Sequence, residues 1–325
     1  MTKIGIIGCG KWGQNYVRTL GSMADSPLYI CCDQNGETLE KIQQQYPWVK
    51  VTKDYQEILQ DQEVEGVIIV TPSDTHYQVA RECLLAGKHI LVEKPFTVNT
   101  TEAENLLKIS THLNKIVMVG HLLLYHPVLP KMKEIIHSGA IGKINYITSN
   151  RANLGCPRQD VNVMWDLTSH DIYTLLYLLE AEPLEVSAWG EGYGGRQLED
   201  VAFVNLRFPG GILAHLQASW IEARKVRELV VVGEKGSVIF DDLQPQEKLK
   251  VYFNDRPNEV QIPSLELSQP LQNECEHFLE SIRENRSPLT NGFEGLRTVR
   301  ILQKAQAFLE SKKQPLLRSS SKERK

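Results

Sequence analysis

Short apolar runs alternate with amphipathic segments along the first 120 residues of the chain. The runs are rich in β-branched residues and apolar on both sides, a pattern typical of strands buried inside a parallel sheet. The segments between them have the apolar spacing of helices, and Gly87 provides a stop signal after one of them. This alternation of strand and helix predicts a doubly wound α/β fold. The runs that we assign to strands are KIGIIG, LYICC, GVIIVT, HILVE and IVMVG.

A different pattern begins near residue 121. Residues 126–142 have the spacing of one helix that ends at a glycine, and residues 201–241 alternate in the manner of strands. Pro209-Gly210-Gly211 and the glycine-bearing turn inside VVVGEKGSVIF are signals for hairpins. The second half of the chain is therefore predicted to hold an antiparallel sheet together with helices.

The remaining pattern sets the domain boundaries. Two further helices are predicted near 270–285 and 292–311. We assign residues 1–120 to a dinucleotide-binding domain and residues 121–317 to a domain for substrate binding and oligomerisation. Residues 318–325 are basic and polar, and we expect them to form a disordered tail.

Composition excludes several classes of protein. The 325 residues are 42% hydrophobic and 23% charged, as in ordinary globular domains, and the formal net charge is −4. No basic surplus is available to neutralise nucleic-acid phosphates, and no apolar run approaches the ~20 residues that span a bilayer. The apolar run at the start of the sequence is too short for a secretory signal. The six cysteines have no zinc-ligand spacing, so we expect reduced thiols, no metal and a cytoplasmic location.

A glycine pattern follows the first predicted strand and opens the first predicted helix. Glycines in this context let the backbone approach a pyrophosphate, while the helix N-terminus supplies favourable dipoles. The alternative is a tight turn between strand and helix with no ligand. The residues that we predict to contact a dinucleotide here are Gly8, Gly10, Lys11, Trp12 and Gly13.

Asp33 ends the second predicted strand, twenty residues after Gly13. A carboxylate at this place accepts hydrogen bonds from the ribose diol of an adenosine. Gln34 and Asn35 follow it, and no arginine is adjacent to bind a 2′-phosphate. The pattern therefore favours NAD over NADP.

Two polar motifs follow two other predicted strands, at the carboxyl ends where ligands bind in such sheets. Thr71, Pro72, Ser73 and His76 belong to the first motif, TPSDTHY, and we predict that they line the cofactor site. The alternatives are that Ser73 or Asp74 caps the next helix and that His76 packs inside the protein.

Glu93, Lys94 and Pro95 form the second motif. Charges at a strand end face the ligand crevice, and proline ends the strand because it has no N–H to donate to the ladder. We predict that Glu93 and Lys94 contact the nicotinamide region. A strand-end salt bridge is the alternative.

The motifs IGCGKWG, TPSDTH and VEKPF, in this order, resemble those of the Gfo/Idh/MocA oxidoreductases. The segments GHLLLYHPVLPKMKEIIHSGAIGKI and VVVGEKGSVIFDD extend the resemblance through the second half. It implies an N-terminal Rossmann domain and a C-terminal α/β domain with a large, mostly antiparallel open sheet. That sheet often forms the oligomer contact, so a homodimer or homotetramer is expected. The resemblance also implies that Lys94 reaches the reacting hydroxyl and that the Lys94–Pro95 bond is often cis.

An Asp-x-x-x-His motif of the same family matches Asp166 and His170. Apolar residues at helical spacing follow, and Thr168 or Ser169 is a candidate cap of that helix. A histidine near a helix N-terminus is favoured in its neutral form, which can accept a proton, and Asp166 can orient it. The alternative is a capping and packing pair.

The segment NRANLGCPRQDVNVMWDL resembles family members linked to nucleotide-sugar metabolism. Arg151, Arg158 and Asn162 are predicted to bind the polar groups of a sugar, a pyrophosphate or a carboxylate. Surface salt bridges are the alternative.

Together these interpretations predict an NAD-dependent hydride transfer from a sugar, with His170 as the base, Asp166 behind it and Lys94 beside the alkoxide. The expected substrate is a UDP-N-acetylhexosamine or its uronic acid, oxidised at C3. The alternatives are an inositol or free-sugar dehydrogenase, an NAD-dependent glycosidase of the family, and a non-catalytic NAD-binding regulator.

Overall fold

The computed structural model describes residues 2–155, 158–193, 195–266 and 268–313. The chain divides into two compact units. The first unit comprises Met1–His126 and Ser268–Val299, and the second comprises Pro127–Leu267 and Arg300–Lys325. Cys156 and the predicted tail at 318–325 lie outside the described residues. The five described cysteines are free and buried.

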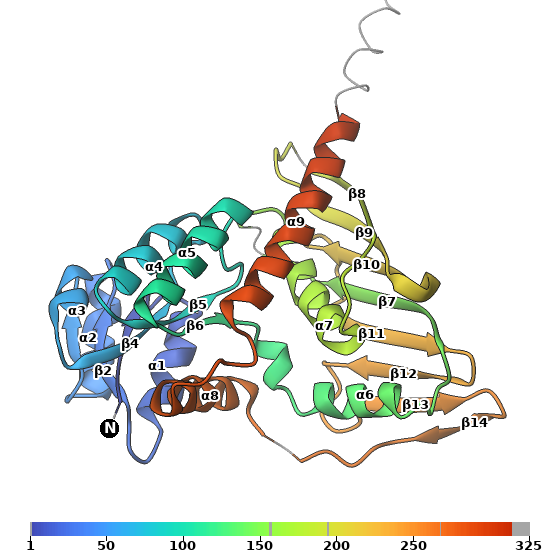
Figure 1. The fold of residues 1–325 in the computed structure, drawn as a ribbon, viewed down its shortest axis with the longest axis horizontal. Coiled ribbons are helices and arrows are strands. Elements are labelled where there is room, and N and C mark those ends of the chain that lie inside the picture. Colours follow the sequence, from blue (N-terminus) through green and yellow to red (C-terminus); the bar gives the residue numbers. More distant parts are fainter. Residues whose placement is uncertain (1, 156–157, 194, 267, 314–325) are drawn as a thin grey trace, which may run out of the picture. The chain divides into compact units, whose positions relative to one another are not determined.

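A six-stranded parallel sheet forms the centre of the first unit, in the order β3-β2-β1-β4-β5-β6. The predicted doubly wound fold is therefore confirmed, with its switch point between β1 and β4. Helices α4 and α5 cover one face of the sheet, and α1 and α8 cover the other (Figure 1). The strands are β1 (Lys3–Ile7), β2 (Leu28–Cys32), β3 (Lys50–Thr52), β4 (Val64–Ile69), β5 (His89–Glu93) and β6 (Val117–Gly120).

The helices of this unit begin and end where local chemistry requires. Asn35 caps α2 by accepting hydrogen bonds from the backbone of Glu37 and Thr38, and Asn99 caps α5. Asn114 ends α5 in the left-handed conformation. The helices are α1 (Gly13–Gly21), α2 (Gly36–Gln45), α3 (Gln56–Gln60), α4 (His76–Leu85), α5 (Thr100–Leu113) and α8 (Pro270–Glu284).

Helix α8 returns to the first unit from a distant part of the sequence. Cys275, Phe278 and Ile282 on its apolar face are buried in one cluster with Ile4 and Ile68 of the sheet. The sequence-based boundaries placed this segment in the second domain, because helical periodicity says which face is apolar and nothing about which sheet it covers. The next helix, α9 (Gly292–Lys313), begins in the first unit and its later turns belong to the second.

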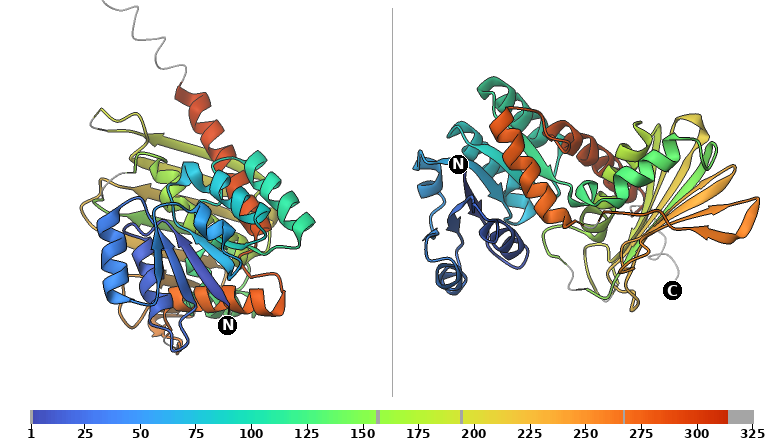
Figure 2. Two further views of the ribbon diagram at one scale, coloured as in Figure 1. Left: turned by 90° about the vertical axis from the view of Figure 1, so that its left-hand side faces the viewer. Right: turned by 90° about the horizontal axis from the view of Figure 1, so that it is seen from below.

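An eight-stranded sheet forms the second unit, in the order β14-β13-β12-β11-β7-β10-β9-β8. Only the β7–β10 pair is parallel within the described strands, so the predicted mostly antiparallel sheet is confirmed. Helices α6 (Val128–His137) and α7 (Ser169–Leu179) lie against one face of it (Figure 2). The strands are β7 (Ile144–Ala152), β8 (Glu185–Glu191), β9 (Val201–Arg207), β10 (Leu213–Ser219), β11 (Val226–Gly233), β12 (Gly236–Asp241), β13 (Leu249–Phe253) and β14 (Arg256–Gln261).

Both predicted hairpins are present. The first joins β9 to β10 through Pro209–Gly211, where Gly210 and Gly211 have φ angles of 76° and 82° that favour glycine. The second joins β11 to β12. Among the described residues, no helix is both long and apolar enough to cross a membrane, and no group of three or more His, Cys, Asp or Glu is placed to hold a metal ion.

Candidate active site

The glycine loop between β1 and α1 leaves room in one place and packs tightly in two others. A Cβ added to Gly8 would lie 2.6 Å from the Val70 carbonyl oxygen, and one added to Gly13 would lie 2.0 Å from the Gly8 oxygen. A Cβ at Gly10 would meet no atom within 4 Å. Gly8 and Gly13 are thus required for backbone packing, whereas Gly10 faces open space beside the N-terminus of α1. This loop fits a dinucleotide pyrophosphate.

Asp33 connects the glycine loop to the end of β2. Its Oδ2 accepts a hydrogen bond of 2.7 Å from the Cys9 amide, and its Oδ1 accepts one of 2.8 Å from the Asn35 amide. A lysine lies close by, since a Cβ added to Gly36 would be 3.3 Å from Lys53 Nζ. The sequence analysis missed this cation because Lys53 follows β3, a strand that its pattern did not single out.

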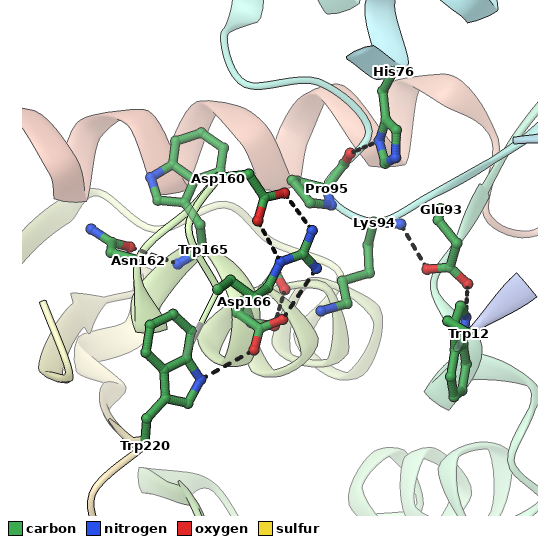
Figure 3. Close-up of polar contacts among 12 residues, drawn as sticks. Trp12, His76, Glu93, Lys94, Pro95, Asp160, Asn162, Trp165, Asp166 and Trp220 are labelled. Atoms are coloured by element: carbon green, nitrogen blue, oxygen red, sulfur yellow. Dashed lines mark hydrogen bonds and ion pairs between the residues drawn. The ribbon is translucent and has the colours of Figure 1, made fainter. Parts of the chain in front are cut away.

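His76 joins the two polar loops at the ends of β4 and β5. Its Nδ1 lies 2.8 Å from the Pro95 carbonyl oxygen and its Nε2 lies 2.9 Å from the Thr71 carbonyl oxygen (Figure 3). The ring is only 1% exposed. His76 therefore holds both loops in register. Ser73 is buried within a short turn, Ser73–Thr75, and Thr75, the residue before α4, forms no capping hydrogen bond with its side chain.

Glu93 receives three hydrogen bonds at the end of β5. Its carboxylate accepts from Trp12 Nε1 and from the Lys94 amide at 3.0 Å (Figure 3). It also accepts from the Tyr16 hydroxyl at 2.8 Å. These donors satisfy a carboxylate that is only 7% exposed. The peptide bond between Lys94 and Pro95 is cis. The strand-end charges thus belong to a network that ties the glycine loop to β5.

In the second unit, a turn of π-helix over Met164–Thr168 leads directly into α7. Asp166 lies in this turn, where its Oδ2 accepts a hydrogen bond of 3.2 Å from Trp220 Nε1 and its Oδ1 lies 3.6 Å from Arg158 NH1 (Figure 3). Arg158 also forms a two-pronged ion pair with Asp160. The structure therefore groups Arg158 with Asp166, as a pair of opposite charges.

His170 lies in the first turn of α7. Its Nδ1 is 2.7 Å from the hydroxyl of Tyr173, one turn further along the helix, and the two rings are T-shaped. The sequence analysis assigned the orienting role to Asp166 and overlooked this partner, although the i, i+3 spacing was readable. Thr168 does not cap α7 with its side chain, because the π-helical turn continues the helix upstream.

Arg151 and Asn162 lie in buried networks instead of an open cleft. Arg151 Nε pairs with Asp171 Oδ1 at 2.7 Å, and the two side chains are 9% and 1% exposed. Burial raises the pKa of Asp171, and Arg151 opposes that effect. Asn162 donates to Gln306 at 2.9 Å, and its Oδ1 accepts from the Trp165 amide at 3.1 Å. These contacts hold the start of the π-helical turn, a structural role that differs from the predicted contact with substrate.

Family models match both parts of the chain. The model for the oxidoreductase family with an NAD-binding Rossmann fold matches residues 2–121. The model for the GFO/IDH/MocA C-terminal domain matches residues 129–239. The chain belongs to the Gfo/Idh/MocA family. It is an oxidoreductase, and the glycine loop and Asp33 lie in its NAD-binding domain.

Two named dehydrogenases match nearly the whole chain. UDP-N-acetylglucosamine 3-dehydrogenase from Acidithiobacillus ferrooxidans is 27% identical over 91% of this chain and 94% of its own length. Myo-inositol 2-dehydrogenase from Thermotoga maritima is 25% identical over 96% of this chain and 97% of its own. A solved structure of the former enzyme matches with a TM-score of 0.84, covering 95% of this chain and 98% of that one, at 27% identity.

Proposed function

We propose that this chain is an NAD-dependent dehydrogenase that oxidises a hydroxyl-bearing carbon of a nucleotide sugar. The preferred substrate is a UDP-N-acetylhexosamine or its uronic acid, and the preferred carbon is C3. The observation that carries the proposal is the contact between His170 Nδ1 and the Tyr173 hydroxyl, in a chain that also places Lys94 after β5. The proposal assigns Lys94, Asp166 and His170 to one catalytic site.

The tautomer of His170 decides whether it can act as a base. A phenol oxygen can accept a hydrogen bond from Nδ1–H, and in that tautomer the lone pair lies on Nε2. His170 Nε2 then takes the proton of the substrate hydroxyl, while Tyr173 fixes the ring. The phenol is neutral, so it orients the imidazole without adding a negative charge beside it.

Lys94 carries the complementary role at the reacting oxygen. As the hydroxyl loses its proton, its oxygen gains negative charge, which the Lys94 ammonium stabilises. A bound nicotinamide would supply the hydride acceptor. The alcohol carbon then loses a hydride, its oxygen loses a proton to His170, and a carbonyl group is formed. Asp166 lies between Arg158 and Trp220, where it can hold Arg158 towards a polar substrate.

The cofactor preference follows from the end of β2. In this proposal Asp33, which already accepts from the Cys9 amide, also accepts from the ribose diol, and its charge repels a 2′-phosphate. Lys53 beside Gly36 acts in the opposite direction, because its ammonium attracts a 2′-phosphate. We assign the preference to NAD because Asp33 receives two backbone hydrogen bonds that fix it in place, a fixed carboxylate being a stronger determinant than a flexible lysine.

The nucleotide-sugar assignment is supported by the 27% identical relative named UDP-N-acetylglucosamine 3-dehydrogenase. A relative named myo-inositol 2-dehydrogenase, 25% identical, makes a cyclitol the second candidate. Both substrates present a secondary alcohol on a six-membered ring, which the proposed His170 and Lys94 roles suit equally.

A substrate panel tests the proposal. NADH formation is followed at about 340 nm with three alcohols, each with NAD. They are UDP-N-acetylglucosamine, the corresponding UDP-linked uronic acid and myo-inositol. We expect turnover with a nucleotide sugar and a kcat/KM at least tenfold lower with myo-inositol. Turnover of myo-inositol and of neither nucleotide sugar would identify a cyclitol as the substrate instead. No NADH with any alcohol, together with tight NAD binding, would favour the glycosidase or the regulator.

A further inference from the structure

Two buried glutamates meet at one tyrosine in the first unit. The hydroxyl of Tyr16, in α1, lies 2.8 Å from Glu93 Oε1 at the end of β5 and 2.9 Å from Glu274 Oε2 in α8. Tyr16 and Glu274 are 0% exposed and Glu93 is 7% exposed. These three side chains, which we call the Glu93–Tyr16–Glu274 chain, lie outside every motif that the sequence analysis singled out except for Glu93.

The number of available protons limits the directions of the hydrogen bonds in the Glu93–Tyr16–Glu274 chain. A phenol has one O–H, so Tyr16 donates to one carboxyl group and can only accept from the other. Glu93 already accepts from Trp12 Nε1 and from the Lys94 amide, so it acts as an acceptor throughout. Tyr16 therefore donates to Glu93, and the carboxyl group of Glu274 must carry the proton that completes the second contact.

The surroundings of Glu274 favour the same assignment. Its second oxygen, Oε1, is buried and has no hydrogen-bond partner among the described residues. A carboxylate oxygen without a donor is costly to bury, whereas the carbonyl oxygen of a neutral acid is less so. Burial raises the pKa of Glu274 well above its ordinary value, and the nearby Glu93 raises it further.

The opposite side of Glu93 has space for its carboxylate and little more. Gly120 is the register partner of Glu93 on β6. A Cβ added to Gly120 would lie 3.1 Å from Glu93 Cδ and 3.2 Å from each carboxylate oxygen. The carboxylate is thus confined between β6 and the donors of α1 and the glycine loop, which makes its position sensitive to the direction of each hydrogen bond.

We propose that Glu274 is a neutral carboxylic acid at neutral pH and acts as a positioning residue. Glu274 donates to Tyr16, and Tyr16 donates to Glu93. The Glu93–Tyr16–Glu274 chain then holds one negative charge, on Glu93, at the proposed nicotinamide end of β5. A single fixed negative charge there stabilises the positively charged ring of NAD⁺ relative to NADH. The inference rests on the proposed function in placing Glu93 beside the nicotinamide, and it names what holds that charge in place.

Three substitutions test the chain by calorimetric binding of NAD⁺ and NADH, which needs no sugar substrate. Glu274→Gln can still donate to Tyr16 from its amide, so the ratio of the two dissociation constants should stay within about twofold of wild type. Glu274→Leu removes the donor and should weaken NAD⁺ binding about fivefold more than NADH binding. Glu93→Gln removes the charge and should shift the ratio by about tenfold against NAD⁺. Ser281→Ala, at another buried polar position of α8, is the matched control and should change neither constant.

Infrared spectroscopy measures the protonation of Glu274 directly. Wild type at neutral pH should show the carbonyl stretch of a buried carboxylic acid, which Glu274→Gln removes and Ser281→Ala retains. An unchanged band in Glu274→Gln, or a dissociation-constant ratio in Glu274→Gln that matches Glu274→Leu, would overturn the inference. If Glu274→Leu fails to fold, the infrared result and Glu274→Gln still decide. Failure to oxidise any sugar leaves these binding results interpretable and counts against the proposed function alone.

Discussion

The Tyr173 hydroxyl lies 2.7 Å from Nδ1 of His170, one turn along α7. The pair comes from a single helix, so its geometry is fixed by the helix itself. In the proposed mechanism the Tyr173 oxygen is the acceptor, which selects the tautomer in which Nε2 can take a proton. It is a positioning residue for the proposed base.

Tyr173→Phe should lower kcat about tenfold with little change in KM, because the base remains but its ring and tautomer are no longer fixed. His170→Asn should remove most of kcat and the acidic limb of the pH profile, while NAD binding persists. The measurement is kcat and KM against pH for both variants. A Tyr173→Phe enzyme with an unaltered kcat would assign the orienting role to another group.

Lys94→Ala should lower kcat by about 10²–10³, the usual effect of losing one well-placed stabiliser of developing charge. The fold and the NAD dissociation constant should change little, because Lys94 follows a strand whose own hydrogen bonds do not involve its side chain. Lys108→Ala, on the exposed side of α5, serves as the control. A loss below about tenfold would contradict the proposed role of the ammonium group.

The cofactor preference can be shifted in both directions. NAD should bind at least tenfold tighter than NADP. Asp33→Ala should narrow this gap by removing the carboxylate that we propose binds the ribose diol, and Lys53→Ala should widen it by removing the cation beside Gly36. Calorimetric titration of wild type and both variants with each nucleotide gives the six dissociation constants needed. Tighter binding of NADP by the wild type would refute the preference.

Arg151→Leu should destabilise the protein by roughly 3–5 kcal/mol, because it leaves Asp171 buried with its charge unpaired. A residue whose main role was contact with substrate would instead change KM and leave stability nearly intact. Urea denaturation and steady-state kinetics on the same preparation separate the two roles. Arg227→Leu, which removes an exposed ion pair, should cost under about 1 kcal/mol.

Acid should destabilise the fold through His89. Its Nδ1 accepts the Ile116 amide at 3.0 Å, and burial followed by the charge of Lys115 lowers its pKa from 6.5 to about 4. Between these values the unfolded chain binds a proton that the folded chain does not, so stability is full above pH 6.5 and falls as pH falls towards 4. His89→Gln keeps an acceptor for Ile116 and should flatten this loss in urea titrations at several pH values. His112→Gln, at an exposed position, should leave the loss unchanged.

Local signals allowed much of the first unit to be predicted. Gly8, Gly10 and Gly13 follow a strand within a few residues, and the charges of Glu93 and Lys94 interrupt an apolar run. Each signal lies in one short segment, where steric and burial rules act directly. Both hairpins of the second unit also follow such local rules.

Partners that are distant in sequence carried no comparable signal. Tyr16 and Glu274 are 258 positions apart, and each occupies an ordinary place in an amphipathic helix. Arg151 was interpreted as a ligand because its segment resembles family members linked to nucleotide-sugar metabolism. Its partner Asp171 lies in a different element, so the sequence could not distinguish a buried ion pair from a substrate contact.

The position of α8 has a consequence for biosynthesis. Phe278 and Ile282 complete a core that also contains Ile4, so the first sheet stays partly uncovered until about 280 residues have left the ribosome. This apolar surface stays exposed on the nascent chain while residues 127–267 of the second unit are synthesised, a long-range closure of the kind that slows folding. A premature stop before α8 would expose the same surface permanently, and such fragments should be substrates for chaperones and proteases.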